Sequence, residues 1–301
     1  MSKNLLIAIC LALLASFRAT AHADSLRDRL KEIVKNANPS KPAPEQAAGV
    51  NPAGTEPEVK IPPIGKVPLE DEVRLGRQIA GNLLGVAPLV KDDKLQQYVN
   101  RIGRWVALQC DRPELNWTFG VIQTEDINAF AAPGGYIFIT RGLYAKLKDE
   151  AELAGVLGHE IAHVQEKHHL KVVQKSQLMD AGAKLLKKKL AKGESAAQRI
   201  IGSGAEILSR GLDKDAEFEA DRLGVVLAAR AGYDAWGLPS VLQEISTVGK
   251  NDSTVGMLFK THPSPDERLT RLSEAMGDRL DSLQPSGNGN GRLYKLAALK
   301  P

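Results

Sequence analysis

The segment Leu153–Val164, which reads LAGVLGHEIAHV, constrains the fold of this chain more than any other segment. Its large apolar residues recur at helical spacing, so one face of the helix would be buried. His159 and His163 are four residues apart and project together from another face. Two imidazoles in this relation can bind one metal ion, and Glu160 would lie beside the open position of that metal. The segment therefore predicts a buried helix that carries a zinc site.

Such a site needs a third ligand from elsewhere in the chain. His169 lies ten residues after His159, but residues 164–172 contain no Gly or Pro that would break the helix. If the helix continues, His169 lies ~9 Å beyond His163, at ~1.5 Å per residue, and cannot reach the same metal. We therefore expect His168 and His169 to lie on the helix surface. The alternative is that they contact a metal-binding side chain and orient it.

Acidic residues of a later helical segment are the other candidates for the third ligand. Glu217 and Asp221 are four residues apart, so they share one helix face. One carboxylate could bind the metal while the other orients an imidazole. Spacing alone leaves Asp213 and Glu219 as further candidates.

Two short segments with alternating apolar residues, Trp117–Ile122 and Tyr136–Thr140, predict strands. Between them, Asn128–Ala132 is apolar except for one side chain. At a sheet edge it could pair with an extended polypeptide substrate, whereas burial in the core is the alternative. Apolar residues recur at helical spacing from Leu69 to Val106, which predicts two helices there. Further helices are predicted over Asp149–Leu190, Ala196–Ala231, Trp236–Thr247 and Asp266–Met276. The fold class is thus α+β and mainly helical, with a small sheet beside the helix of His159.

The first 23 residues have the three regions of a secretory signal peptide. Lys3 gives the positive start, Leu5–Leu14 is the apolar run, and residues 21–23 have small residues at the two positions that signal peptidase recognises. The run is shorter than the ~20 apolar residues that span a bilayer. We expect an exported, soluble protein of the periplasm.

The local content of proline, glycine and lysine predicts how the rest of the chain is divided into linker, folded domain and tail. Eight of the 16 prolines lie within residues 39–68, so residues 24–68 are predicted to be a Pro-rich linker. The folded domain would cover 69–284, and the Gly-containing residues 285–301 would form a flexible C-terminal tail. The five lysines of Lys184–Lys192 predict either a peripheral contact with an anionic membrane or a solvated helix end.

The charge balance argues against nucleic acid as a partner. Forty Lys and Arg stand against 36 Asp and Glu, which gives a formal net charge of +4. So small an excess does not indicate a dedicated basic face. Partners must be inferred from sites instead.

Four motifs together resemble the CAAX prenyl protease/HtpX-like family of gluzincin metallopeptidases. In order and spacing they are Asn128–Leu143, Glu152–His163, Glu217–Gly224 and Thr261–Arg268. The resemblance covers most of residues 69–280 and implies a zincin fold of the gluzincin type. It implies one zinc ion per chain with ligands His159, His163 and Glu217, the catalytic base Glu160, and Asp221 as a carboxylate that supports the ligands. A chain without a membrane span after its signal is similar to the soluble periplasmic branch of that family.

Two functions from different classes fit these residues. The first is a zinc-dependent metalloendopeptidase that hydrolyses misfolded or unassembled periplasmic proteins in quality control. The alternative is a non-catalytic zinc-containing chaperone or assembly factor of the envelope. Glu160 favours the enzyme, because a structural zinc site needs no carboxylate beside the metal.

His262 lies in a turn bracketed by Pro263 and Pro265, which restrict the backbone. Three roles fit it: a catalytic donor to the oxyanion of the tetrahedral intermediate, a fourth zinc ligand that keeps the enzyme latent, or a structural residue that caps a helix. The sign of the change in activity in His262→Ala would separate the first two roles.

Overall fold

The computed structural model describes residues 59, 61–62, 64–190, 211–248, 252–256, 258–262, 264–279 and 292–295. The predicted signal peptide and most of the predicted linker lie outside this range, as do the side chains of the lysine-rich segment. Among the described residues, no helix combines the length and apolar composition that crossing a membrane requires. The elements in chain order are α2 (Leu69–Val86), α3 (Asp93–Ala107), β1 (Thr118–Ile122), β2 (Ala129–Ala132), β3 (Tyr136–Thr140), α4 (Arg141–Tyr144), α5 (Glu150–Gln165), α6 (His168–Leu190), α8 (Lys214–Arg230), α9 (Gly237–Thr247), the 3₁₀ helix η1 (Ser253–Val255), α10 (Leu258–Thr261) and α11 (Pro265–Met276).

The predicted fold class is confirmed, since the described residues form a mainly helical α+β structure with one small sheet. Strand β3 lies in the middle, parallel to β1 and antiparallel to β2. Strand β2 therefore occupies one edge of the sheet, and it is formed by the last four residues of the segment Asn128–Ala132, all of them buried. The parallel pairing of β1 with β3 requires a crossover, which the chain makes through β2.

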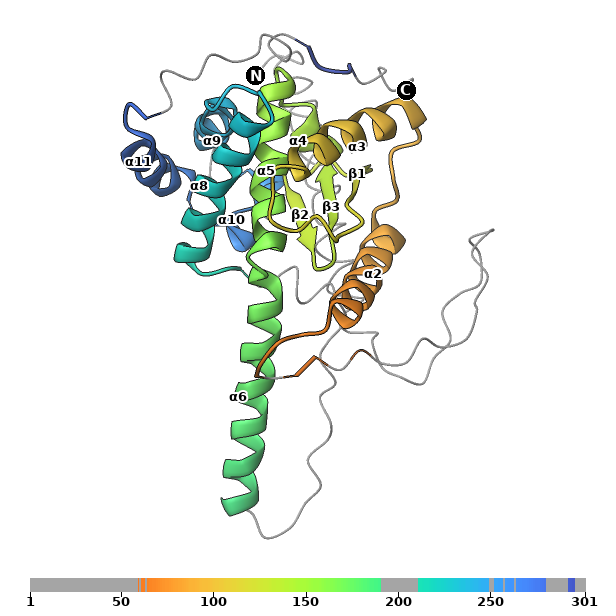
Figure 1. The fold of residues 1–301 in the computed structure, drawn as a ribbon, viewed down its shortest axis with the longest axis vertical. Helices are drawn as coiled ribbons and strands as arrows, with labels where there is room; N and C mark the ends of the chain where they lie inside the picture. Colours follow the sequence, from red (N-terminus) through yellow and green to blue (C-terminus); the bar gives the residue numbers. More distant parts are fainter. Residues whose placement is uncertain are drawn as a thin grey trace, which may run out of the picture.

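Helix α5 is the centre of the fold. It lies between the sheet with α3 on one side and helices α8, α9 and α11 on the other (Figure 1). Fifteen of its 16 residues are buried, from Glu150 to Val164. Its N-terminus is fixed by Asp149, whose side chain accepts a hydrogen bond of 2.9 Å from the backbone N–H of Glu152.

A pair of glycines sets the distance between α5 and α8. A Cβ atom on Gly158 would lie 2.6 Å from the carbonyl oxygen of Gly224, and a Cβ on Gly224 would lie 2.6 Å from the backbone nitrogen of His159. The two helices can approach this closely only because neither residue has a side chain. The approach brings the first turns of α8 beside the two histidines of α5.

The prediction of one continuous helix over Asp149–Leu190 is wrong. Helix α5 ends at Gln165, and α6 begins at His168. Between them Lys167 adopts a left-handed backbone conformation with φ of 58°, which a residue with a Cβ atom adopts at a cost. The ammonium group of Lys167 lies 3.4 Å from the buried carboxylate of Glu72, which helps to hold this turn. Helix α6 then extends away from the rest of the fold (Figure 1).

Part of the predicted flexible tail packs against the domain. The hydroxyl of Tyr144 donates a hydrogen bond of 2.7 Å to the backbone carbonyl of Tyr294. The guanidinium of Arg292 lies 3.1 Å from Glu150. Residues 292–295 are thus anchored, whereas the rest of 285–301 lies outside the described range.

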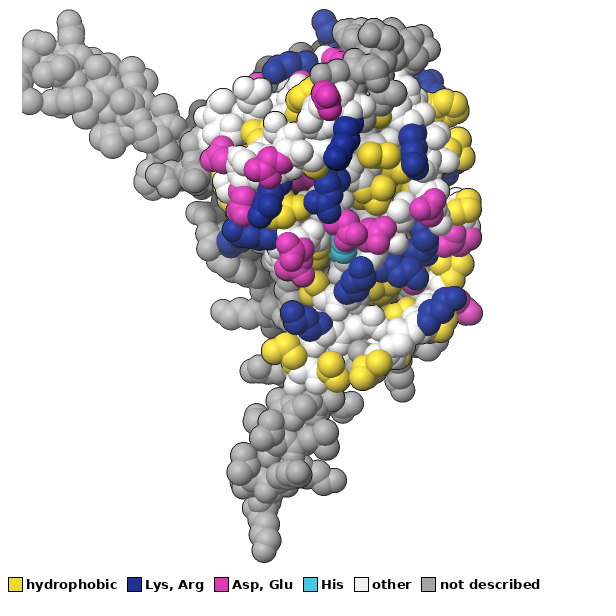
Figure 2. Space-filling model, turned by 60° about the vertical axis from the view of Figure 1, so that its left-hand side comes forward, with side chains coloured by type: hydrophobic (Ala, Val, Ile, Leu, Met, Phe, Trp, Pro, Cys, Tyr) yellow, Lys and Arg dark blue, Asp and Glu magenta, His cyan; other side chains and the backbone are white. Residues whose placement is uncertain are grey.

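Acidic and basic side chains are interspersed on the face drawn in Figure 2, with apolar side chains between them. No single sign of charge dominates that face. Very little histidine surface is visible there. The histidines of interest are inside the molecule, where His159, His163, His168 and His262 are all buried.

Candidate metal centre and active site

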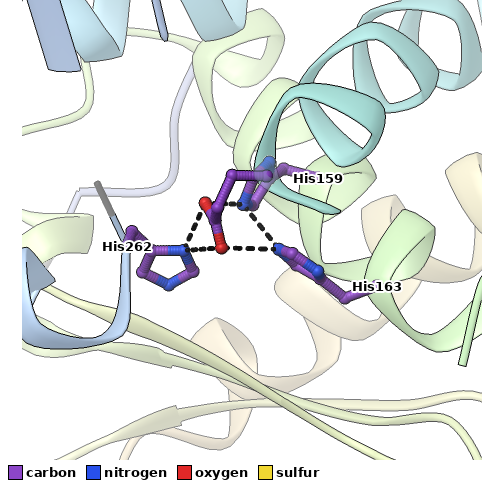
Figure 3. Close-up of side chains that lie close together, drawn as sticks. His159, His163 and His262 are labelled. Carbon is purple, nitrogen blue, oxygen red and sulfur yellow. Dashed lines mark hydrogen bonds and ion pairs between the residues drawn. The ribbon is translucent and has the colours of Figure 1, made fainter. Parts of the chain in front are cut away.

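Four buried side chains converge on one point inside the protein. His159, His163, Glu217 and His262 each offer one ligand atom, and these atoms all lie within 4.8 Å of one another. Figure 3 shows the three imidazoles around the carboxylate of Glu217. The Nε2 atoms of His159 and His163 lie 3.7 and 3.5 Å from the Glu217 oxygens. The structure thus brings together the three predicted ligands.

Three separate elements supply these side chains. Helix α5 carries the two histidines four residues apart, and α8 carries Glu217 in its first turn. The side chain of Asp213 caps the N-terminus of α8, where it accepts a hydrogen bond of 2.9 Å from the backbone N–H of Ala216. Asp213, a candidate ligand by spacing, is therefore a helix cap outside the cluster. His262 follows α10, in the turn before α11.

The outward nitrogen of His159 is held by a hydrogen bond to a carboxylate. Its Nδ1 lies 2.9 Å from Oδ1 of Asp221, so Nδ1–H donates to this carboxylate and leaves Nε2 for a metal. Arg268 of α11 in turn donates from Nη2 and Nε to Asp221, at 2.5 and 2.8 Å. All three side chains are buried. Asp221 thus lies where the sequence placed it, whereas Arg268 had been given no role.

The outward nitrogen of His163 has a different partner. Its Nδ1 lies 2.9 Å from Nδ1 of His168, and Nε2 of His168 lies 3.2 Å from Oε2 of Glu219. The prediction that His168 lies on the helix surface is wrong, because its side chain is buried. Glu219, the other candidate ligand, contacts His168 rather than the cluster. His169 is partly buried, and its ring lies 5.9 Å from that of His163.

His262 contacts the third ligand directly. Its Nδ1 lies 2.8 and 3.0 Å from the two carboxylate oxygens of Glu217. Helix α11 has no side-chain hydrogen bond at its N-cap, Ser264. The ring of His262 therefore points to the metal cluster and not to the start of a helix. This placement agrees with a role at the reaction centre or as a ligand, and disagrees with the helix cap.

Glu160 lines a small cavity beside the cluster. The cavity has a volume of about 30 Å³, close to the share of one water molecule in the liquid. His159 and His262 also line it, and the rest of the lining is mainly apolar, from Ala129 of β2 and from α9 and α10. A water molecule fits there, but a polypeptide does not.

The buried groups have shifted pKa values that suit these contacts. Burial raises the pKa of the Glu160 carboxyl, although the nearby His159 opposes this effect. Burial and the neighbouring imidazoles hold the pKa of His163 well below its usual value, so the ring is neutral and able to bind a metal. Burial alone would raise the pKa of Glu217, but His262 and Arg268 lower it. The same carboxylate raises the pKa of His262, against the effect of burial.

The donor set of the cluster fits zinc. Two imidazole nitrogens and a carboxylate oxygen form one of the common three-residue ligand sets of catalytic zinc. The outward nitrogen of each imidazole contacts a protein group, and for His159 the partner is a carboxylate, which favours the tautomer that binds a metal. With Glu160 beside the cluster, the site is that of a metallohydrolase.

Comparison with known proteins agrees with this class of site. Residues 93–276 match the model of peptidase family M48, and the chain belongs to this family. The match confirms the resemblance of the four motifs to the CAAX prenyl protease/HtpX-like peptidases. The chain is 27% identical over 241 residues to the beta-barrel assembly-enhancing protease of Yersinia pestis, covering 77% of this chain and 48% of that protein.

Two further similarities extend beyond bacteria. The mitochondrial metalloendopeptidase OMA1 of Arabidopsis thaliana is 30% identical over 161 residues, covering 54% of this chain and 32% of that protein. The crystal structure of Ste24p from S. mikatae is similar with a TM-score of 0.40 and 18% identity, over 68% of this chain and 56% of that chain. The chain spans about half the length of the bacterial relatives it matches.

Proposed function

We propose that this chain is a zinc-dependent metalloendopeptidase of the periplasm that cleaves misfolded or unassembled proteins. The observation that carries the proposal is the buried cluster of His159, His163 and Glu217 with Glu160 beside it. Membership in peptidase family M48 supports the same reaction. The location is supported by the signal-like residues 1–23 and by similarity to proteins named as beta-barrel assembly-enhancing proteases.

The residues of the site have distinct tasks in this proposal. His159, His163 and Glu217 hold the ion, and a bound zinc ion supplies Lewis acidity to the scissile carbonyl group. Glu160 takes a proton from the attacking water and gives it to the leaving amine. Asp221 keeps His159 in the tautomer that binds metal.

An extended substrate would pair with the edge strand β2. Its first residue, Ala129, lines the cavity beside Glu160, so a strand added to β2 would pass the cluster. The side-chain amide of Asn128 is buried, and neither of its polar atoms has a hydrogen-bond partner among the described residues. A peptide backbone at this edge could supply such partners. Because the cavity has room for about one water, entry requires α9 and α10 to move away from it.

The proposal is tested with purified protein and unfolded casein. We expect about one bound metal ion per chain by elemental analysis, and casein cleavage that stops after treatment with a chelator and returns with zinc. Glu160→Gln should retain the metal and lose cleavage by roughly 10²-fold or more, the usual contribution of a general base. Glu274→Gln, the same change at an exposed carboxylate of α11, should cleave normally.

The alternative function predicts another outcome. A non-catalytic chaperone or assembly factor would bind zinc, leave casein intact, and behave the same as its Glu160→Gln variant. If Glu160→Gln also restored a deletion strain fully, binding rather than cleavage would be the function.

A further inference from the structure

We propose that His168 is a positioning residue for the metal centre: it fixes the ring of His163, and Glu219 fixes His168. The inference rests on the proposed function in one respect, since it takes His163 to be a metal ligand. It assigns a role to two residues outside the metal cluster itself. The evidence is a continuous series of contacts from the cluster to the protein surface.

The first step concerns the hydrogen between the two imidazoles. Their Nδ1 atoms are 2.9 Å apart, so one must donate and the other accept. A metal on Nε2 of His163 needs the lone pair of that nitrogen, which leaves the hydrogen on Nδ1. His168 must then accept at Nδ1. Only one arrangement of hydrogens is consistent with metal binding.

The second step explains the need for Glu219. A neutral imidazole that accepts at Nδ1 has its hydrogen on Nε2. In this structure Nε2 of His168 lies 3.2 Å from Oε2 of Glu219, a carboxylate that can only accept when ionised. The carboxylate therefore favours the tautomer of His168 that His163 requires. The chain of groups is a carboxylate, an imidazole and a ligand imidazole.

The third step is the backbone that places His168. On a continuous helix His168 would be five residues after His163, about 140° around the axis at ~100° per residue, and the rings could not meet. The left-handed conformation of Lys167 ends α5 and turns the start of α6 back toward His163. A strained residue between two functional histidines is what a positioning role would require.

The outer end of the series is open to solvent. The side chain of Glu219 is 48% exposed, whereas that of His168 is 3% exposed. Both line a hollow of about 500 Å³ together with charged residues that include Lys171, Asp215 and Arg271. His168 thus separates the metal cluster from this hollow. His169 is the natural control, because its Nδ1 has no hydrogen-bond partner among the described residues.

The test measures zinc affinity of the purified full chain with a competing chelator. His168→Leu should raise the Kd for zinc roughly 10–100-fold, the usual effect of losing a group that orients a ligand. His168→Asn should recover most of this loss, since the amide oxygen can accept from His163. His169→Leu should bind zinc as the wild type does. The visible spectrum of the Co²⁺-loaded protein should change in His168→Leu and not in His169→Leu.

A second pair of variants avoids any change in the buried core. Glu219→Lys places a donor against Nε2 of His168 and favours the wrong tautomer, so the Kd for zinc should rise about tenfold, at the lower end of such effects. Asp215→Lys makes the same change of charge at another carboxylate that lines the same hollow, and should have less than a twofold effect. Equal effects of the two lysine variants, or wild-type zinc affinity in both His168→Leu and Glu219→Lys, would overturn the inference. If the wild type itself binds no zinc, the proposed function fails instead.

Discussion

The two histidines of α5 differ in how their outward nitrogens are held. His159 contacts Asp221, which forms a bidentate ion pair with Arg268, and all of these groups are buried. His163 contacts His168, whose other nitrogen reaches the half-exposed carboxylate of Glu219. We call each set of partners a support. The His159 support, Asp221 with Arg268, is charged and entirely buried. The His163 support, His168 with Glu219, consists of a neutral buried imidazole and a carboxylate that reaches solvent. The first is therefore tied to the stability of the fold, and the second mainly to the orientation of one ring.

This difference follows from where each partner originates. Asp221 and Arg268 come from α8, which packs against α5, and from α11, which packs against α8 and α9. Removing either partner leaves a buried charge, which is expensive in a medium of low dielectric. His168 is the first residue of α6, which directly follows α5 in the chain. Its ring is neutral, so removing its partner leaves no buried charge. Both supports orient a histidine of α5, but the loss of a partner should lower the free energy of unfolding much more in the His159 support than in the His163 support.

The largest effect is expected from Arg268→Met. The variant leaves the carboxylate of Asp221 buried without its cation, so the free energy of unfolding should fall by about 3–5 kcal/mol. Urea denaturation measures this change. Arg271→Met is the matched control on the same helix, because Arg271 is exposed and lies 5.5 Å from the ring of Phe218. Its loss should cost about 1 kcal/mol or less. Equal costs in the two variants would mean that the Asp221 support is not the stabilising one.

His262→Ala tests the role of the third imidazole in the cluster, which contacts Glu217. Because Nδ1 of His262 lies among the ligand atoms and the cavity is small, we expect this histidine to hold the site closed. Casein cleavage should then increase, about tenfold for each ~1.4 kcal/mol by which the contact favours the closed state. A loss of roughly 10²–10³ in activity would identify His262 as a donor to the oxyanion instead. Unchanged activity with lower stability would leave only a structural role.

Gly224→Ala tests whether the close approach of α5 and α8 is needed. A Cβ atom there would lie 2.6 Å from the backbone nitrogen of His159, so the helices must separate. Overpacking of this kind costs about 1–3 kcal/mol, and zinc affinity should fall because Glu217 and Asp221 move with α8. The control is Gly81→Ala, in an exposed part of α2 with no atom within 4 Å of the new Cβ. That variant should be as stable as the wild type or more so. Wild-type stability and zinc binding in Gly224→Ala would contradict the explanation.

Much of the site could be predicted from sequence because it depends on local periodicity. The relation of His159, Glu160 and His163 follows from one helical turn, and the shared face of Glu217 and Asp221 from another. Arg268 was missed, although a buried Asp221 implies a cation nearby and this arginine lies in a recognised motif. That signal was present and could have been used.

The position of His168 could not be predicted in the same way. It depends on the left-handed conformation of Lys167, and neither Gly nor Pro marks the break. Tertiary contacts determine this turn. One of them joins Lys167 to Glu72, two residues that are 95 positions apart in sequence. The order of the sheet, with β3 between β1 and β2, likewise depends on long-range pairing that alternation alone does not encode.

The smallest effect is expected from Glu219→Gln, at the open end of the His163 support. An amide oxygen can still accept from Nε2 of His168, but it carries no full charge and so favours the required tautomer less strongly. Because Glu219 is half exposed, water competes for the same hydrogen and limits what the carboxylate contributes. Zinc affinity should therefore fall by less than about tenfold, and the free energy of unfolding should change by less than about 0.5 kcal/mol, as for most surface substitutions. Competition with a chelator measures the first quantity and urea denaturation the second. A loss of stability close to that of Arg268→Met would show that the two supports are alike after all, and that exposure does not separate positioning from stability in this site.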